Sequence, residues 1–132
     1  MDALERLLHE RAIERLLVDY VAWNDASDWE RVAGSYVAEG RMSRPTAPDD
    51  FIEGREAILA AFRARPARQS RHVVANVRVD VADEGTATAE SQILLFLEQK
   101  APPLVGSYRD RLRLTDEGWR FVERRGSLDF TD

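Results

Sequence analysis

The C-terminal half of the chain consists of four extended segments separated by short turn-forming sequences. Alternating apolar and polar residues, typical of strands with one buried face, occur over residues 71–82, 86–98, 104–115 and 118–130. The connections ADEG (82–85) and TDEG (115–118) each end in the glycine that a tight hairpin needs for positive φ, and KAPP (100–103) closes the middle connection. This half therefore predicts an antiparallel meander.

The N-terminal part of the chain has helical periodicity instead. A long amphipathic helix ending near Asn24 is predicted from one apolar stripe. The stripe consists of Leu4, Leu8, Ala12, Leu16 and Tyr20, widened by Leu7, Ile13, Leu17 and Val21. A second helix, running to about Tyr36, is predicted to follow, with Ser27 of the capping box SDWE (27–30) as its cap. After it come a strand in GRMSRP (40–45), a loop at Pro45 and Pro48, and a helix over 54–65.

Helices followed by a meander predict an α+β domain, in which the helices cover one face of a curved antiparallel or mixed sheet. The 132 residues, 44% of them hydrophobic, suffice for one compact core. Residues 1–132 are therefore expected to form a single domain. A curved sheet covered on one side by helices leaves a concave pocket between the two layers.

Charge and composition exclude several classes of function. The net charge of −5 disfavours a nucleic-acid surface, because phosphate binding requires a concentrated basic face. The one local basic cluster, at arginines 63, 65, 68 and 71, is interpreted as solvated surface rather than an anion site. Arginine outnumbers lysine 18 to 1, which is typical of a GC-rich genome and suggests a bacterial source.

Redox and cofactor motifs are also lacking. The sequence contains no cysteine, so disulfides and thiolate metal sites are excluded. No nucleotide-binding or zinc-protease motif occurs, and the two histidines are far apart in sequence, so neither a cofactor nor a metal is expected. The charged, periodic N-terminus predicts neither a signal peptide nor a membrane span, and a cytoplasmic location is expected.

The order of elements and four sequence stretches carry a resemblance to a known family. These stretches are AIERLLVDYVAWNDASDWERVAGSYVAEGRM, GREAILAAF, RHVVANVRVDV and YRDRLRLTDEGWRFVERR. Over nearly the whole chain they resemble the SnoaL-like branch of the nuclear transport factor 2-like superfamily. That branch includes scytalone dehydratase, hexachlorocyclohexane dehydrochlorinase, bile acid 7α-dehydratase, polyketide cyclases and the small subunits of ring-hydroxylating dioxygenases. The resemblance implies a cone-shaped α+β barrel with an apolar pocket.

The resemblance also implies catalytic residues. In the dehydratase and dehydrochlorinase members, an aspartate at the end of the first helix and a histidine at the start of the strand after the third helix form a dyad. Asp25 and His72 stand at those positions, and Tyr20 matches a tyrosine of the bile acid dehydratase pattern. The second histidine of scytalone dehydratase has no counterpart, because His9 lies in the first helix.

Asp25 has an independent interpretation from its place on the helix. It continues the Leu17 and Val21 stripe by one more i+4 step, so it should face the interior. A carboxylate at a helix C-terminus meets the negative end of the helix dipole, which is unfavourable unless a cation compensates. An imidazolium would provide that compensation.

The strand pattern places a condition on His72. Strict alternation puts it on the face opposite the valines at 73, 77, 79 and 81, so it would point away from the helices. A β-bulge near residues 74–76 would reverse the phase and turn His72 inward. The alternative is a structural histidine bonded to backbone at the start of a strand.

A dyad of this kind would perform general acid–base chemistry. His72 would take a proton from carbon or water, Asp25 would orient the imidazole and stabilise its cation, and Tyr20 would donate a hydrogen bond to a developing oxyanion or leaving group. The sequence thus predicts a cofactor-independent lyase or isomerase acting on a small apolar molecule. Tyr20 packed on the helix stripe with its hydroxyl in solvent is an equal alternative.

Further side chains are candidates for binding the substrate. Arg124 matches an arginine near the dehydrochlorinase pocket, although alternation does not decide whether Arg124 or Arg125 points inward. The candidates for the pocket wall are Trp23, Tyr36, Met42, Phe62 and Phe96. The alternative for each of them is an ordinary place in the hydrophobic core. Trp119 is interpreted as structural.

Two non-catalytic functions remain open from the sequence. One is a partner subunit like those of the dioxygenases, which keep the fold without the chemistry. The other is a module that sequesters an apolar ligand. Whatever the function, the outer face of the sheet needs covering. SnoaL-like relatives associate through that sheet as dimers or trimers, so the resemblance implies a homo-oligomer, a trimer or a dimer.

Overall fold

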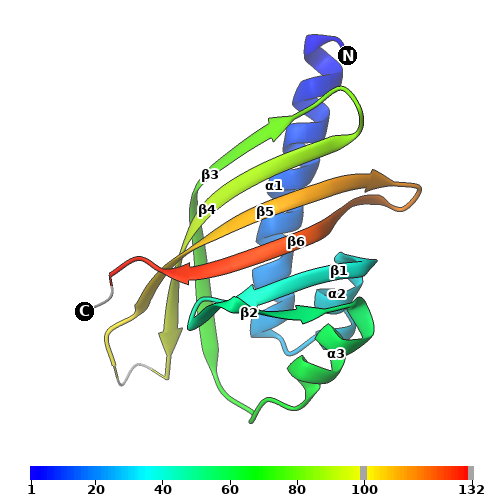
Figure 1. The fold of residues 1–132 in the computed structure, drawn as a ribbon. Helices are drawn as coiled ribbons and strands as arrows, with labels where there is room; N and C mark the ends of the chain where they lie inside the picture. The colour runs from blue at the N-terminus through cyan, green and yellow to red at the C-terminus, as the bar shows by residue number, and fades with distance from the viewer. Residues whose placement is uncertain (99–100, 131–132) are drawn as a thin grey trace.

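The computed structural model describes residues 1–98 and 101–130. Three helices and six strands follow one another along the chain (Figure 1). They are α1 (Ala3–Asp25), α2 (Trp29–Gly34), β1 (Tyr36–Arg44), β2 (Ala47–Glu53), α3 (Arg55–Arg63), β3 (Ser70–Val81), β4 (Thr86–Leu97), β5 (Leu104–Thr115) and β6 (Gly118–Leu128). The predicted α+β class, helices followed by a sheet, is confirmed.

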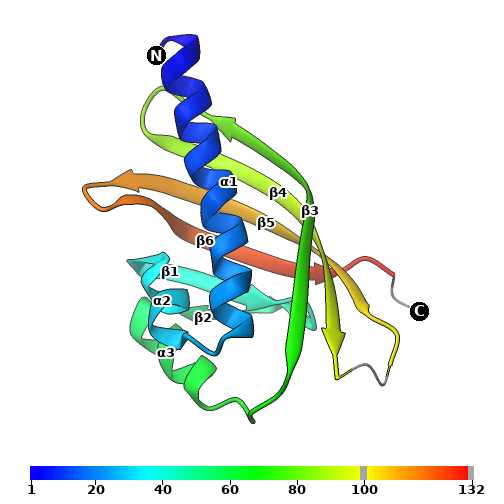
Figure 2. The ribbon, with the colours of Figure 1, turned by 180° about the vertical axis from the view of Figure 1, so that it is seen from behind.

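The six strands form one mixed sheet in the order β2-β1-β6-β5-β4-β3. Only β1 and β6 run parallel, and the other neighbouring pairs are antiparallel. The sheet curves around α1, which crosses its inner face (Figures 1 and 2), and β2 and β3 remain as open edges. The core lies between α1 and the sheet, with Ile13, Leu17 and Phe121 fully buried.

The C-terminal meander matches its prediction to within a few residues. The turn glycines have the expected positive φ, 78° at Gly85 and 106° at Gly118. The predicted KAPP connection (100–103) begins outside the described residues. Local turn chemistry is therefore sufficient to define this part of the fold.

The predicted apolar stripe of α1 is wrong in its first half. Leu4, Leu7 and Leu8 are exposed, and the buried face begins at Ile13. The reason is visible in Figure 1, where the first turns of α1 extend beyond the strands. Apolar spacing predicts a helix, but burial requires a partner surface.

The capping prediction is wrong by one residue. Asp28 rather than Ser27 caps α2, and its side chain accepts a hydrogen bond from the Arg31 amide at 3.3 Å. Ser27 has a φ of 57° and belongs to the turn before the helix. Both residues are good capping types, so local sequence does not separate them.

Strand β2 lies where the two prolines predicted a loop. It pairs antiparallel with β1, with Met42 opposite Ile52, and forms an edge of the sheet. Proline is tolerated on edge strands because the outer side of such a strand needs no amide donor. Pro48 was therefore compatible with a strand that the sequence interpretation excluded.

A β-bulge in β3 decides the direction of His72. The pairing of β3 with β4 shifts between Ala75 and Arg78, and Asn76 has a φ of 54°. His72 and Val74 before the bulge, and Val77 after it, consequently face the interior, whereas Val73 is 43% exposed. The bulge named as a condition in the sequence is present at that place.

Asn76 provides a test of the bulge. Asparagine tolerates the left-handed region better than a β-branched residue does. Asn76→Val is therefore expected to lower the free energy of unfolding by about 1–2 kcal/mol, and the matched Asn76→Gly by less. Urea unfolding of the two variants measures this difference. Equal stabilities would contradict the strained conformation.

Candidate active site

Asp25 and His72 are hydrogen-bonded to one another. Asp25 is the last residue of α1, and His72 is the third residue of the adjoining strand β3. The ring Nδ1 of His72 lies 2.6 Å from Asp25 Oδ1, and the backbone amide of His72 donates to Asp25 Oδ2 at 2.9 Å. The two side chains are 5% and 11% exposed. The two residues that the resemblance pairs are thus in contact, and both side chains are largely buried.

Ser70 adds a third hydrogen bond to the same carboxylate. Its hydroxyl donates to Asp25 Oδ1 at 3.0 Å. Sequence reasoning missed Ser70, although its position two residues before His72 places it on the same strand face. Three donors from β3 compensate a carboxylate that lies at the unfavourable end of the helix dipole.

The environment of His72 favours its neutral form. Burial lowers the pKa of His72 below its ordinary value of 6.5; the hydrogen bond and charge of Asp25 oppose this shift, and the positive charges of Arg68 and Arg124 add to it. An ionised Asp25 can only accept, so the neutral ring donates from Nδ1 and keeps its lone pair on Nε2. That lone pair is the basic atom of the site.

A second cluster of polar side chains surrounds Arg124, which is completely buried. Its guanidinium carbon lies over the rings of Tyr20 and Tyr108, 4.4 and 3.8 Å from their centroids. The two tyrosines predicted for the site meet directly, with the hydroxyls of Tyr20 and Tyr36 2.8 Å apart. Tyr20 thus does not direct its hydroxyl into solvent.

The choice between Arg124 and Arg125 is resolved by a second irregularity. The pairing of β5 with β6 shifts after Arg111, and the next pair joins Leu112 to Phe121. Phe121 and Arg124 therefore both face inward although they are three residues apart. Arg125 points outward, where it bonds Pro48 and Asp49.

The tyrosines of this group keep their protons. Burial raises the pKa of Tyr20 to about 12, with the charge of Arg124 opposing the rise, and burial also raises the pKa of Tyr36. In a hydroxyl pair only one proton lies between the two oxygens. The other proton is free to be donated to a bound molecule.

Asp110 is the anionic neighbour of Arg124. Its Oδ1 lies 3.1 Å from Arg124 Nε, and both side chains are fully buried. Burial raises the pKa of Asp110 to about 6 against the opposing charge of Arg124. The sequence interpretation did not identify Asp110 or Tyr108, because neither residue belongs to the quoted dyad pattern.

The remaining candidate residues divide into core and surface. Met42 pairs with Arg124 across β1 and β6, and Phe62 stacks on Trp29 at 5.2 Å between ring centroids. Trp23 lines a groove of about 310 Å³ together with residues of α2, and neither Asp25 nor His72 lines that groove. Phe96 is 40% exposed, opposite Arg71 on the outer face of the sheet, which contradicts its expected place in the pocket wall.

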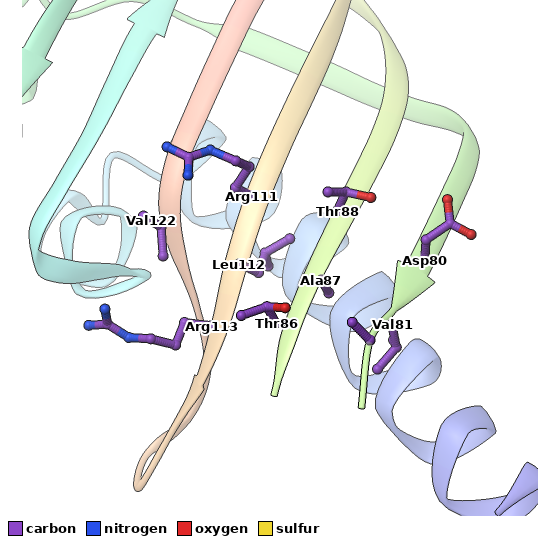
Figure 3. Close-up of a pocket in the computed structure, with 10 residues that line it drawn as sticks. Asp80, Val81, Thr86, Ala87, Thr88, Arg111, Leu112, Arg113 and Val122 are labelled. Atoms are coloured by element: carbon purple, nitrogen blue, oxygen red, sulfur yellow. The ribbon is translucent and has the colours of Figure 1, made fainter. Parts of the chain in front are cut away.

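A groove of about 560 Å³ crosses the outer face of the sheet (Figure 3). Arg111 and Arg113 of β5 and Thr88 of β4 line it, with α1 behind the strands in this view. Its arginines are already paired, with Glu123 and Glu39 respectively. Neither Asp25 nor His72 lines this groove, so it is separate from the buried site.

Within 1–98 and 101–130, no three histidine, aspartate or glutamate side chains are grouped so that they could hold a metal ion. No helix in those ranges is both long and apolar enough to cross a membrane.

This chain is similar to a known protein family and to several solved structures. A model of the SnoaL-like domain matches residues 5–125. A Novosphingobium aromaticivorans protein assigned provisionally as a scytalone dehydratase is 26% identical, with a TM-score of 0.82, over 96% of this chain and 87% of that one. No curated protein matches the chain.

Two further structures share the fold. A nuclear transport factor 2-like protein with a cystatin-like fold, also from Novosphingobium aromaticivorans, is 25% identical with a TM-score of 0.86 over 98% of this chain and 87% of that one. ActVI-ORFA from Streptomyces coelicolor is 20% identical with a TM-score of 0.73 over 90% and 96%.

Proposed function

The chain belongs to the SnoaL-like domain family, and from this membership we propose that it is a cofactor-independent lyase or isomerase. The observation that carries the proposal is the buried hydrogen bond between Asp25 and His72, 2.6 Å long. A neutral imidazole held by a carboxylate is the arrangement that general-base catalysis requires. The substrate is a small, largely apolar molecule with an acidic C–H bond.

In the proposed mechanism, Nε2 of His72 removes a proton from carbon or from water. Asp25 holds the ring through Nδ1 and stabilises the imidazolium that forms. The Tyr20 and Tyr36 pair donates its free proton to the oxyanion or leaving group that develops. Elimination, double-bond migration and aldol-type cyclisation all begin with such a proton transfer.

We further propose a cytoplasmic homo-oligomer, a trimer or a dimer. The outer face of the sheet supports this because it exposes apolar side chains at one end, including Val73 and Phe96, 43% and 40% exposed. Exposed apolar patches on a sheet are typical of interaction surfaces.

The experiment that tests the enzymatic proposal is hydrogen exchange in D₂O. Purified protein is incubated with hydroxylated or halogenated alicyclic compounds and with polyketide-like compounds, and deuterium incorporation at carbon is followed by NMR. Catalysed exchange or elimination is expected for at least one class. Compounds that bind without any exchange would instead indicate the ligand-binding module.

The pH dependence of exchange follows from the state of His72. Only the neutral ring accepts a proton, and burial lowers its pKa, so the rate is expected to rise with pH and reach half its maximum below pH 6.5. Burial raises the pKa of Asp110 to about 6, which lies in the same pH range. An Asp110→Asn variant should therefore keep the rising limb. If the rise of the exchange rate with pH disappears in this variant, that rise reports the titration of Asp110 rather than of His72.

A further inference from the structure

The guanidinium of Arg124 has donors with no acceptor. It is completely buried, and neither Nη1 nor Nη2 has a hydrogen-bond partner. Asp110 approaches only the Nε side, at 3.1 Å. A buried donor without an acceptor is costly, and two adjacent guanidinium N–H groups match the two oxygens of a carboxylate.

Arg65 is a second cation whose charge acts on the same tyrosines. It follows α3, is half-buried, and lies over the ring of Phe62 with its guanidinium carbon 4.6 Å from the centroid. Burial and the neighbouring charges of Arg44 and Arg68 lower the pKa of Arg65 to about 10, while Tyr108 and Tyr20 raise it. These two tyrosines are the ones that contact Arg124.

Arg65 and the two arginines that lower its pKa form no ion pair with a carboxylate in the part of the chain that the structure describes. Among the ion pairs within residues 1–98 and 101–130, none involves Arg44, Arg65 or Arg68. Arg63, two residues before Arg65, is in contrast exposed and bound to Glu30 at 2.9 Å. The region around the half-buried Arg65 thus carries an excess of positive charge, which a bound anion would offset.

We propose that this region binds the carboxylate of the substrate, between Arg124 in the interior and Arg65 at the rim, with the apolar body of the substrate beside the tyrosines. The substrate class is a small carboxylic acid. Assigning the anion to the substrate rests on the proposed function, whereas the binding site itself does not. The sequence interpretation of the arginine cluster as solvated surface is therefore replaced for Arg65.

Anion binding would also act on the base. The groups that bear on the charge of His72 are Asp25 from α1, Arg68 from the loop before β3, and Arg124 from β6. A bound carboxylate offsets the two arginine charges, so the imidazolium becomes easier to form. The pKa of His72, followed by NMR, is expected to rise when the carboxylate is bound.

The test compares carboxylates with their neutral amides. Benzoate and cyclohexanecarboxylate are titrated into the protein by calorimetry, alongside benzamide and cyclohexanecarboxamide. The carboxylates are expected to bind at least about tenfold more tightly than the amides, and more weakly at high salt. Arg65→Gln should reduce this preference by about tenfold, because it removes one charge-assisted contact. The matched control Arg63→Gln should leave it unchanged.

The outcomes separate the two proposals. Equal binding of acids and amides, no binding of either acid, or equal losses in the Arg65 and Arg63 variants would overturn the carboxylate site. His72→Ala should keep the preference for carboxylates. If wild-type protein shows the preference but exchanges no C–H bond in these acids or in the other compounds, the acid–base role fails and the anion site stands.

Discussion

Replacing His72 with alanine is expected to reduce C–H exchange by about 10²-fold or more, because the variant lacks the imidazole proposed to accept the proton. The side chain is 5% exposed, so some packing is lost. The backbone amide of residue 72 still donates to Asp25, however, and the strand should persist. The rate is measured by deuterium incorporation, and the fold by circular dichroism.

The second histidine offers a matched control for this prediction. His9 lies in α1 and accepts a hydrogen bond from Trp119 Nε1 at 3.1 Å. It has no part in the proposed proton transfer. His9→Ala should leave the exchange rate unchanged. If the His72 variant exchanges substrate as fast as wild type, His72 is not the base.

The Asp25→Asn variant is expected to lose about 10²- to 10⁴-fold in rate while keeping the shape of the side chain. A neutral amide no longer stabilises the imidazolium. Its single oxygen can accept from the ring or from the backbone amide of His72, but its NH₂ group then faces the other donor. The ring consequently loses the orientation and the tautomer that leave Nε2 free. Single-turnover exchange measures the loss.

Asp19 supplies the control for Asp25. It lies on the outside of the same helix, where Arg15 donates to it at 2.9 Å. Asp19→Asn should retain full activity. The double variant lacking both Asp25 and His72 should lose little more than His72→Ala alone, because the two residues serve one proton transfer. Strictly additive losses would argue against a dyad.

Much of the fold was predictable because its determinants are local. The meander follows from alternation and turn glycines, and Gly85 and Gly118 adopt the positive φ that was expected. Strand β2 and the exposed leucines of α1 depend instead on tertiary structure, namely an edge position in the sheet and a helix whose first turns extend past the strands (Figure 1). A sequence pattern carries no direct signal of either.

The site was predictable in its chemistry but not in its surroundings. Asp25 lies on the buried stripe, and the resemblance pairs it with His72. Arg124 could not be separated from Arg125 by alternation, because the irregular pairing in β6 brings Phe121 and Arg124 to the same face. Asp110 belongs to the site through a contact across strands, which no spacing within one segment reveals.

The bulge at Asn76 has a consequence for how proteins of this kind could diverge. The extra residue lets His72 and Val77, which are five positions apart, lie on the same inner face of β3. A substitution that let residue 76 pair regularly with β4 would keep the chain length but turn the residues before it over. His72 would then face solvent, while Val77, Val79 and Val81 kept their place in the core. Such a descendant would retain Asp25 and His72 in its sequence and still be inactive. In this architecture, catalysis can be lost through a change at position 76, which belongs to neither residue of the dyad.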